Sequence, residues 1–153
     1  VPAVVMATMT QTEPVVIVGK QRSVEDWKRE VSAIRDAMFR ARNLEGMELV
    51  ASCQSAVLAA AVGLITRAAE RRTPLLIDAP LTATAALLAE RDNPGVKAWL
   101  FATTLSTAPA HELALRKLGL QPLQQLAMEP EPALGALAAL PMLLTGVEIA
   151  ADA

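Results

Sequence analysis

The feature that most constrains the fold of this chain is an alternation of short apolar runs with longer segments rich in alanine and leucine. Four runs have the length and composition of buried strands, namely residues 15–19, 74–78, 99–103 and 123–128. Helices that join consecutive strands act as crossover connections, which place the strands parallel to one another. The sequence therefore predicts an α/β fold with a mostly parallel sheet of three or four strands, flanked by Ala/Leu-rich helices in a Rossmann-like three-layer arrangement.

The segments between these runs carry recognisable helix signals. Ser23 is a candidate N-cap with Asp26 three residues later, and four apolar residues follow on one helical face: Trp27, Val31, Ile34 and Met38. Pro109 suits a first helical position and Gly119 a helix end. A final helix is expected from near residue 132 toward residue 151, bent by Pro141.

One stretch of the chain, residues 49–66, has the apolar character of a membrane span. It contains Ser52, Gln54 and several alanines, which insert weakly into a bilayer, and its length is near the lower limit for a span. We expect this stretch to form one or two buried helices within the segment 47–70, and we expect no membrane as a partner.

Composition limits the class of protein further. A chain of 153 residues suits one domain, predicted over 15–153 with an N-terminal extension at 1–14, and 3% aromatic residues require an aliphatic core. The net charge of −2 argues against nucleic acid as a partner. Cys53 is the single cysteine, so neither an internal disulfide nor a thiolate metal cluster is expected, and a cytoplasmic setting is the default.

The ends of the chain lead to two further expectations. Residues 1–10 lack a basic flank and a convincing apolar core, so no signal peptide is expected there. The sequence starts with Val1, which fits a processed form, a trimmed chain or a fragment of something longer.

In parallel sheets, ligands bind beyond the carboxyl ends of the strands. This rule directs attention to four loops, at residues 19–23, 78–81, 103–111 and 128–135. None of them contains a self-sufficient nucleotide-binding, metal-binding or nucleophile motif.

The order of three segments nevertheless resembles a known enzyme family. The segments are LLIDAPLTATAALLAE, NPGVKAWLFATTLSTAPAHELALRKLGLQPLQQL and GALAALPML, and the run LGLQPL between two helices is fairly specific. The chain resembles the C-terminal half of the nicotinate-nucleotide–dimethylbenzimidazole phosphoribosyltransferases. The resemblance covers roughly residues 15–147 and is strongest from Pro74 onward.

This resemblance implies a transfer of ribose phosphate from nicotinate mononucleotide to a benzimidazole nitrogen in the assembly of the lower ligand of cobalamin. In the family a glutamate is the general base, and Gly-rich backbone with a Ser-His segment holds the phosphate, without a metal or cofactor. The nicotinate leaving group is already cationic, so positioning and one base suffice. The implied partners are small-molecule substrates, together with a second copy of the chain or a missing N-terminal half.

The chain departs from the family pattern in the segments that contain the general base and the phosphate-binding residues. The Gly-Glu-Gly-Thr-Gly segment before the final helix corresponds to Glu131-Pro132-Ala133-Leu134-Gly135, so that Pro132 stands in place of the base. Glu131 is either a displaced catalytic base or part of a stiff, solvated helix entry. The Ser-His-x-Ser-x-Glu-Pro-Gly-His run corresponds to residues 103–111, which retain Ser106, Pro109 and His111.

Further departures affect glycines. Asp78-Ala79 replaces an Asp-Gly pair and Gln54-Ser55 replaces a Gly-Gly pair, while the loop after Gly19 is shorter than in the family. These changes concern the backbone that would approach a nucleotide most closely.

Eight positions remain candidates for substrate or phosphate binding by this carry-over: Gly19, Lys28, Asp78, Thr103, Thr104, Ser106, His111 and Gly135. Each polar candidate also has an ordinary structural interpretation. Asp78 suits a turn or cap, the hydroxyls suit backbone hydrogen bonds, Lys28 suits a solvated helix face, and His111 suits a first-turn position without a ligand.

Three functions follow from these observations. The chain is a divergent phosphoribosyltransferase or one part of such an enzyme, or a binding or regulatory relative that has lost the base, or an interaction domain whose apolar helices form a dimer.

Overall fold

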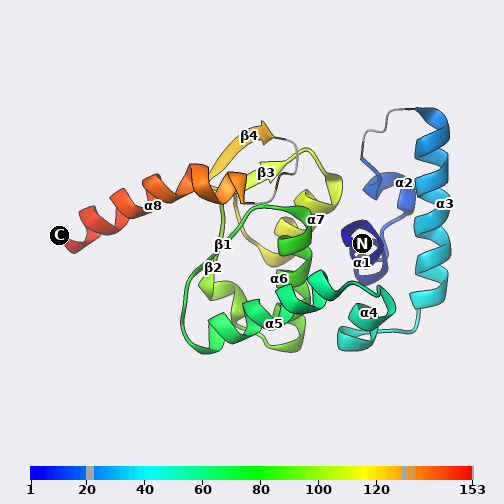
Figure 1. Ribbon diagram of the computed structural model, residues 1–153, viewed down its shortest axis with the longest axis horizontal. Coiled ribbons are helices and arrows are strands. Elements are labelled where there is room, and N and C mark those ends of the chain that lie inside the picture. Colours follow the sequence, from blue (N-terminus) through cyan, green and yellow to red (C-terminus); the bar gives the residue numbers. More distant parts are fainter. Residues whose placement is uncertain (20–22, 129–130, 132, 153) are drawn as a thin grey trace.

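The computed structural model describes residues 1–19, 23–128, 131 and 133–152, and these form an α/β structure (Figure 1). The elements are α1 (Pro2–Thr10), α2 (Pro14–Ile17), α3 (Val24–Ala41), α4 (Gly46–Ser52), α5 (Ala56–Glu70), β1 (Leu75–Ile77), α6 (Pro80–Asp92), a 3-10 turn (Val96–Trp99), β2 (Leu100–Ala102), β3 (Thr104–Ser106), α7 (Pro109–Leu118), β4 (Gln124–Met128) and α8 (Leu134–Ala151).

The strands form two parallel pairs, and a single residue connects the last strand of the first pair to the first strand of the second. β1 pairs with β2, and β3 pairs with β4. Only Thr103 separates β2 from β3; its N–H donates to Ile77 O (2.9 Å), and its carbonyl accepts from Gln124 N (3.0 Å). The two pairs are thus joined in the order β1, β2–β3, β4, with α6 and α7 as the crossovers. The predicted α/β fold with parallel strands is confirmed.

Several predicted helix boundaries are confirmed by their caps. Asp26 N donates to Ser23 Oγ (3.1 Å), so Ser23 is the N-cap of α3. Pro109 is the first residue of α7, and Gly119 ends that helix with a φ of 71°. Val31 and Ile34 are buried on the predicted face of α3.

The strand predicted at residues 15–19 is wrong, because residues 14–17 form the short helix α2. Pro14 occupies the first helical position, where its missing N–H costs nothing. Ile17 and Val18 are buried, and α2 contacts α1, α3 and α7. The β-branched run is therefore buried among helices, and this packing outweighs its intrinsic preference for a strand.

The one or two helices expected within residues 47–70 are present, but residues 49–66 are not the stretch most like a membrane span. Two helices, α4 and α5, share this stretch, and the chain breaks between them at Gln54, whose φ is 49°. Among the described residues, the one helix long and apolar enough to cross a membrane is α8, with a mean hydropathy of 1.8 and 11% of its residues buried.

The core joins the N-terminal helices to the sheet region. Val5, Met6 and Ala7 of α1 are fully buried, and α1 packs against α3, α6 and α7. The segment expected to be an N-terminal extension thus contributes to the same core. Cys53 is partly buried, and burial raises the pKa of its thiol.

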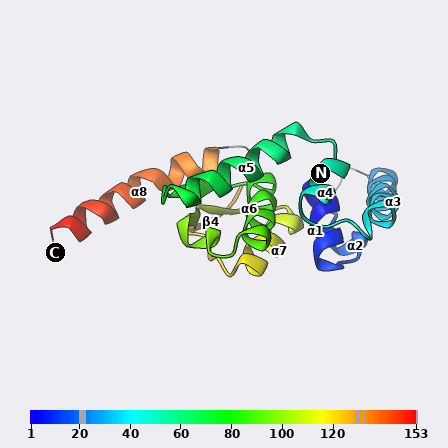
Figure 2. The same ribbon diagram turned by 90° about the horizontal axis from the view of Figure 1, so that it is seen from below.

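The two ends of the molecule differ in shape. Helix α3 lies at one end, beyond α1 and α2, while α8 extends away from the strands at the other (Figures 1 and 2). The carboxyl end of the sheet, where ligands are expected, adjoins the first turn of α8.

Candidate functional site

Five polar side chains are buried at or just beyond the carboxyl ends of the strands. Asp78 follows β1, Thr103 and Thr104 lie at the β2–β3 junction, Ser106 ends β3, and His111 lies in the first turn of α7; each is at most 7% exposed. We call this set the strand-end cluster. Burial of polar groups is costly unless they are hydrogen-bonded, so the partners of these side chains decide what the cluster can do.

Two threonines hold the backbone of this region. Thr103 Oγ1 donates to Ile77 O (3.1 Å), which ties β1 to the β2–β3 junction. Thr82 Oγ1 accepts from Ala79 N (3.1 Å) and donates to Ala79 O (3.0 Å), which fixes the turn from β1 into α6. Thr103, a predicted ligand, therefore uses its hydroxyl within the fold, and Thr82 supports the turn that presents Asp78.

Ser106 and His111 form a buried pair. The backbone N–H of Ser106 donates to Nδ1 of His111 (3.2 Å), and Ser106 Oγ lies 2.9 Å from the same nitrogen. Because Nδ1 accepts a hydrogen bond, the ring proton of a neutral imidazole resides on Nε2. Burial lowers the pKa of His111 to about 4, against the opposing influence of the Asp78 carboxylate. His111 is thus neutral near pH 7.

The first turn of α8 closes over Asp78 and Thr104. The N–H of Ala136 donates to Oδ2 of Asp78 (3.4 Å). A Cβ on Gly135 would collide with Thr104 Oγ1 and would lie 2.9 Å from Thr104 Cγ2 and 3.1 Å from Asp78 Cβ. Only glycine permits this approach, so Gly135 brings α8 into contact with the strand-end cluster.

The remaining predicted site residues lie in different places. Gly19 approaches the start of α7, since a Cβ there would lie 3.3 Å from Cδ of Pro109. Lys28 is exposed on α3, which α1 and α2 separate from the strands (Figures 1 and 2). Glu131 is exposed before α8, and Pro132 lies outside the described residues. The structure therefore brings together the predicted residues that follow the strands, but not Lys28.

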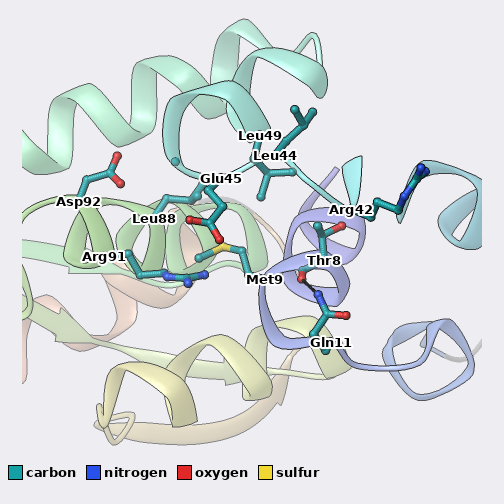
Figure 3. Close-up of a pocket in the computed structure, with 11 residues that line it drawn as sticks. Thr8, Met9, Gln11, Arg42, Leu44, Glu45, Leu49, Leu88, Arg91 and Asp92 are labelled. Atoms are coloured by element: carbon teal, nitrogen blue, oxygen red, sulfur yellow. Dashed lines mark hydrogen bonds between the residues drawn. The ribbon is translucent and has the colours of Figure 1, made fainter. Parts of the chain in front are cut away.

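A separate cavity of about 490 Å³ lies between the end of α1, the start of α4 and the end of α6 (Figure 3). Its walls include Met9, Leu49 and Leu88, and Glu45 and Arg91 point toward each other across it. None of the predicted site residues lines this cavity. α6 connects the two regions, because it starts at the strand-end cluster and ends at the cavity.

Comparison with known proteins decides the family. A sequence profile described as "Phosphoribosyltransferase" matches residues 1–153. The nicotinate-nucleotide–dimethylbenzimidazole phosphoribosyltransferase of Corynebacterium glutamicum is 43% identical over 98% of this chain, and that of Mycobacterium ulcerans is 44% identical over 95%. The chain belongs to this phosphoribosyltransferase family. The crystal structure of the enzyme from Thermus thermophilus agrees, with a TM-score of 0.85 and 31% identity over 93% of the chain.

The match covers only part of each relative. The chain spans 43% of the Corynebacterium glutamicum protein, 42% of the Mycobacterium ulcerans protein and 42% of the Thermus thermophilus chain. The chain therefore resembles a phosphoribosyltransferase over about two fifths of the length of such a protein.

Two non-glycine residues keep a left-handed backbone where the family pattern has glycine. Ala133, the N-cap of α8, has a φ of 67°, and Gln54, which precedes α5, has a φ of 49°. A side chain in this conformation costs about 1–2 kcal/mol relative to glycine. At both positions a residue with a side chain thus has a backbone conformation that suits glycine best.

Proposed function

We propose that this chain is a nucleotide-binding member of the phosphoribosyltransferase family that has lost the proton acceptor for transfer. The supporting observation is the combination of a family match over residues 1–153 with Pro132 in the position of the base. Proline has no atom that can accept a proton, whereas Asp78, Ser106, Pro109, His111 and Gly135 still match the family pattern. The proposed ligand is nicotinate mononucleotide or the ribazole phosphate product.

The reaction itself explains why the loss is decisive. Transfer breaks the bond from C1′ of the ribose to the nicotinate nitrogen and forms a bond from C1′ to a benzimidazole nitrogen. The bond forms at the ring nitrogen that has a free lone pair, so the proton on the other nitrogen of the same ring must leave, and a carboxylate held within hydrogen-bond distance accepts it. Glu131 is adjacent in sequence, but a displacement of about 1 Å already impairs catalysis.

The geometry of the strand-end cluster favours binding by backbone and hydroxyl groups over binding by charge. His111 is neutral, and Lys28 lies on a distant helix. Within the described part of the chain, a phosphate would therefore depend on N–H groups at the start of α7, which carry a partial positive charge, because the Asp78 carboxylate already lies at the start of α8.

Thermal denaturation in the presence of ligand tests this proposal. Nicotinate mononucleotide and ribazole phosphate are each titrated against the chain, with dimethylbenzimidazole alone as the control. At a ligand concentration of 100 Kd, binding stabilises the folded state by about 2.7 kcal/mol, which raises Tm by several degrees. A flat titration with both phosphorylated compounds would contradict nucleotide binding.

A second function, self-association, is favoured by α8. Seven large apolar side chains of this helix are at least 39% exposed: Leu134, Leu137, Leu140, Met142, Leu144, Val147 and Ile149. A helix that is apolar on all sides is normally buried. We propose that a second copy of the chain or the remaining part of a longer family member covers α8 in a cytoplasmic protein. Sedimentation analysis distinguishes a homodimer from a monomer.

A further inference from the structure

Helix α8 is anchored to the rest of the molecule mainly through its first turn. Gly135 and Ala139 are its buried residues among those described, and its main packing partner is β3. The N-cap residue of α8 is Ala133, whose methyl group cannot accept a hydrogen bond. The first N–H groups of a helix require acceptors, which are here supplied by water or by side chains from another part of the chain.

Asp78 supplies such an acceptor from the end of β1. Its Oδ2 accepts from Ala136 N, 58 residues later in the chain, and its side chain is 7% exposed. A carboxylate at this position also interacts favourably with the positive end of the helix dipole. Asp78 therefore does for α8 what an N-cap side chain does in an ordinary helix.

The approach of the helix to Asp78 depends on Gly135. Its missing side chain leaves the space that Thr104 and Asp78 Cβ occupy. The turn from β1 into α6, held by Thr82, fixes where the Asp78 carboxylate points. Three chain segments thus converge on one turn of α8.

We propose that Asp78 is a positioning residue, which sets the first turn of α8 and thereby residues 133–135, the end of the segment that corresponds to the base-bearing segment of the family. This inference rests on the proposed function for its relevance to nucleotide binding, but the contact itself does not. It differs from the interpretation of Asp78 as a ribose ligand, because the carboxylate acts through Ala136 and not through the substrate.

Amide hydrogen exchange measured by NMR tests this role without any ligand. Asp78→Ala removes the acceptor, and Thr84→Val is the matched control, since Thr84 is fully buried in α6 and its hydroxyl donates to Pro80 O. Loss of a hydrogen bond to a charged group predicts that the amides of Ala136 and Leu137 exchange about tenfold faster in Asp78→Ala than in Thr84→Val.

Asp78→Asn gives a second measurement if the alanine variant does not fold. The asparagine retains an acceptor oxygen without the charge, so exchange at Ala136 should lie between wild type and Asp78→Ala. Equal exchange of the α8 first turn in Asp78→Asn and wild type, or in Asp78→Ala and Thr84→Val, would overturn the proposal.

A parallel titration of wild type with nicotinate mononucleotide separates this inference from the proposed function. Absence of a thermal shift contradicts nucleotide binding and leaves the Asp78 contact standing. Unchanged exchange at Ala136 contradicts the positioning role and leaves nucleotide binding standing.

Discussion

The strand-end cluster contacts the first turn of helix α8, but the two regions differ in which side chains they expose to water. In the cluster, polar side chains such as Asp78 and Ser106 are buried and hydrogen-bonded to protein. In α8, apolar side chains such as Leu137 and Val147 are 64% and 67% exposed. The cluster resembles the interior of a finished protein, whereas α8 resembles one side of an interface.

This difference separates the strand-end cluster, which the chain organises by itself, from the exposed part of α8, which a partner would cover. The cluster is organised by contacts within the chain, although Nε2 of His111 is buried without a hydrogen-bond partner among the described residues. The exposed part of α8 gains stability only when another apolar surface covers it. The two regions are joined through Gly135, where the helix leaves the body of the protein.

The largest expected effect concerns the exposed part of α8. The double variant Leu137→Glu/Leu144→Glu should abolish self-association, because two buried charges would oppose the contact. The measurement is sedimentation equilibrium, with Val57→Glu on α5 as the control, since Val57 is 66% exposed on a different helix. Association that survives in the double variant would place the interface elsewhere.

The next effect concerns acid stability through His111. Its pKa is about 4 in the folded protein, below its ordinary value of 6.5. As the pH falls below 6.5, the unfolded chain binds the proton first, so the free energy of unfolding decreases until about pH 4. The loss is about 1.4 kcal/mol per pH unit and about 3 kcal/mol over the window.

Urea denaturation between pH 4 and 7.5 measures this slope, with His111→Asn as the comparison. The variant has no group that titrates in this window at position 111, so its slope should be smaller than that of wild type. Parallel slopes would show that His111 does not contribute.

The next prediction compares the effect on stability of glycine substitutions in the first turn of α8, which packs on β3, and near its exposed C-terminal end. Gly135→Ala inserts a methyl group against Thr104 and should destabilise the chain by about 1–3 kcal/mol. Gly146→Ala, at a helical position with open space around it, should instead stabilise the chain by about 0.5–1 kcal/mol. Equal signs for the two variants in urea denaturation would refute the contrast between the two ends.

The smallest effect concerns the left-handed residue at the start of α8. Ala133→Gly relieves the strain at φ 67° and increases the freedom of the unfolded chain, for a net stabilisation of about 0.5–1 kcal/mol. Thermal denaturation detects this change, and a lower Tm would show that the alanine methyl group makes a compensating contact.

Local patterns in the sequence predicted much of the region from β1 to α7. The runs around Ile77 and Ala102 are apolar and bounded by helix signals, so strand and crossover could both be inferred. β3 was not predicted, because Thr104–Ser106 is polar and short. The error at residues 15–19 has the opposite cause, since a strand-like run is buried among helices that only the folded chain brings together.

The position of the candidate site could be predicted from the sequence, but the charge state and the contacts of its residues could not. The rule that ligands bind beyond parallel strands selected the loops that contain Asp78, Ser106 and His111, and all three residues are buried at the strand ends. The neutrality of His111 and the contact of Gly135 with Thr104 depend on burial and on segments far apart in sequence. Thr82 could have been found from its place three residues after the N-cap Ala79, which is half of a capping box.

The central claim is that the family framework persists here without a proton acceptor. The most direct test fuses to this chain the part of the Corynebacterium glutamicum relative that the match does not cover, and measures ribazole phosphate formed from nicotinate mononucleotide and dimethylbenzimidazole. The account predicts no product with the natural Pro132 and measurable product with Pro132→Glu/Ala133→Gly. Equal rates of product formation by both fusions would contradict it.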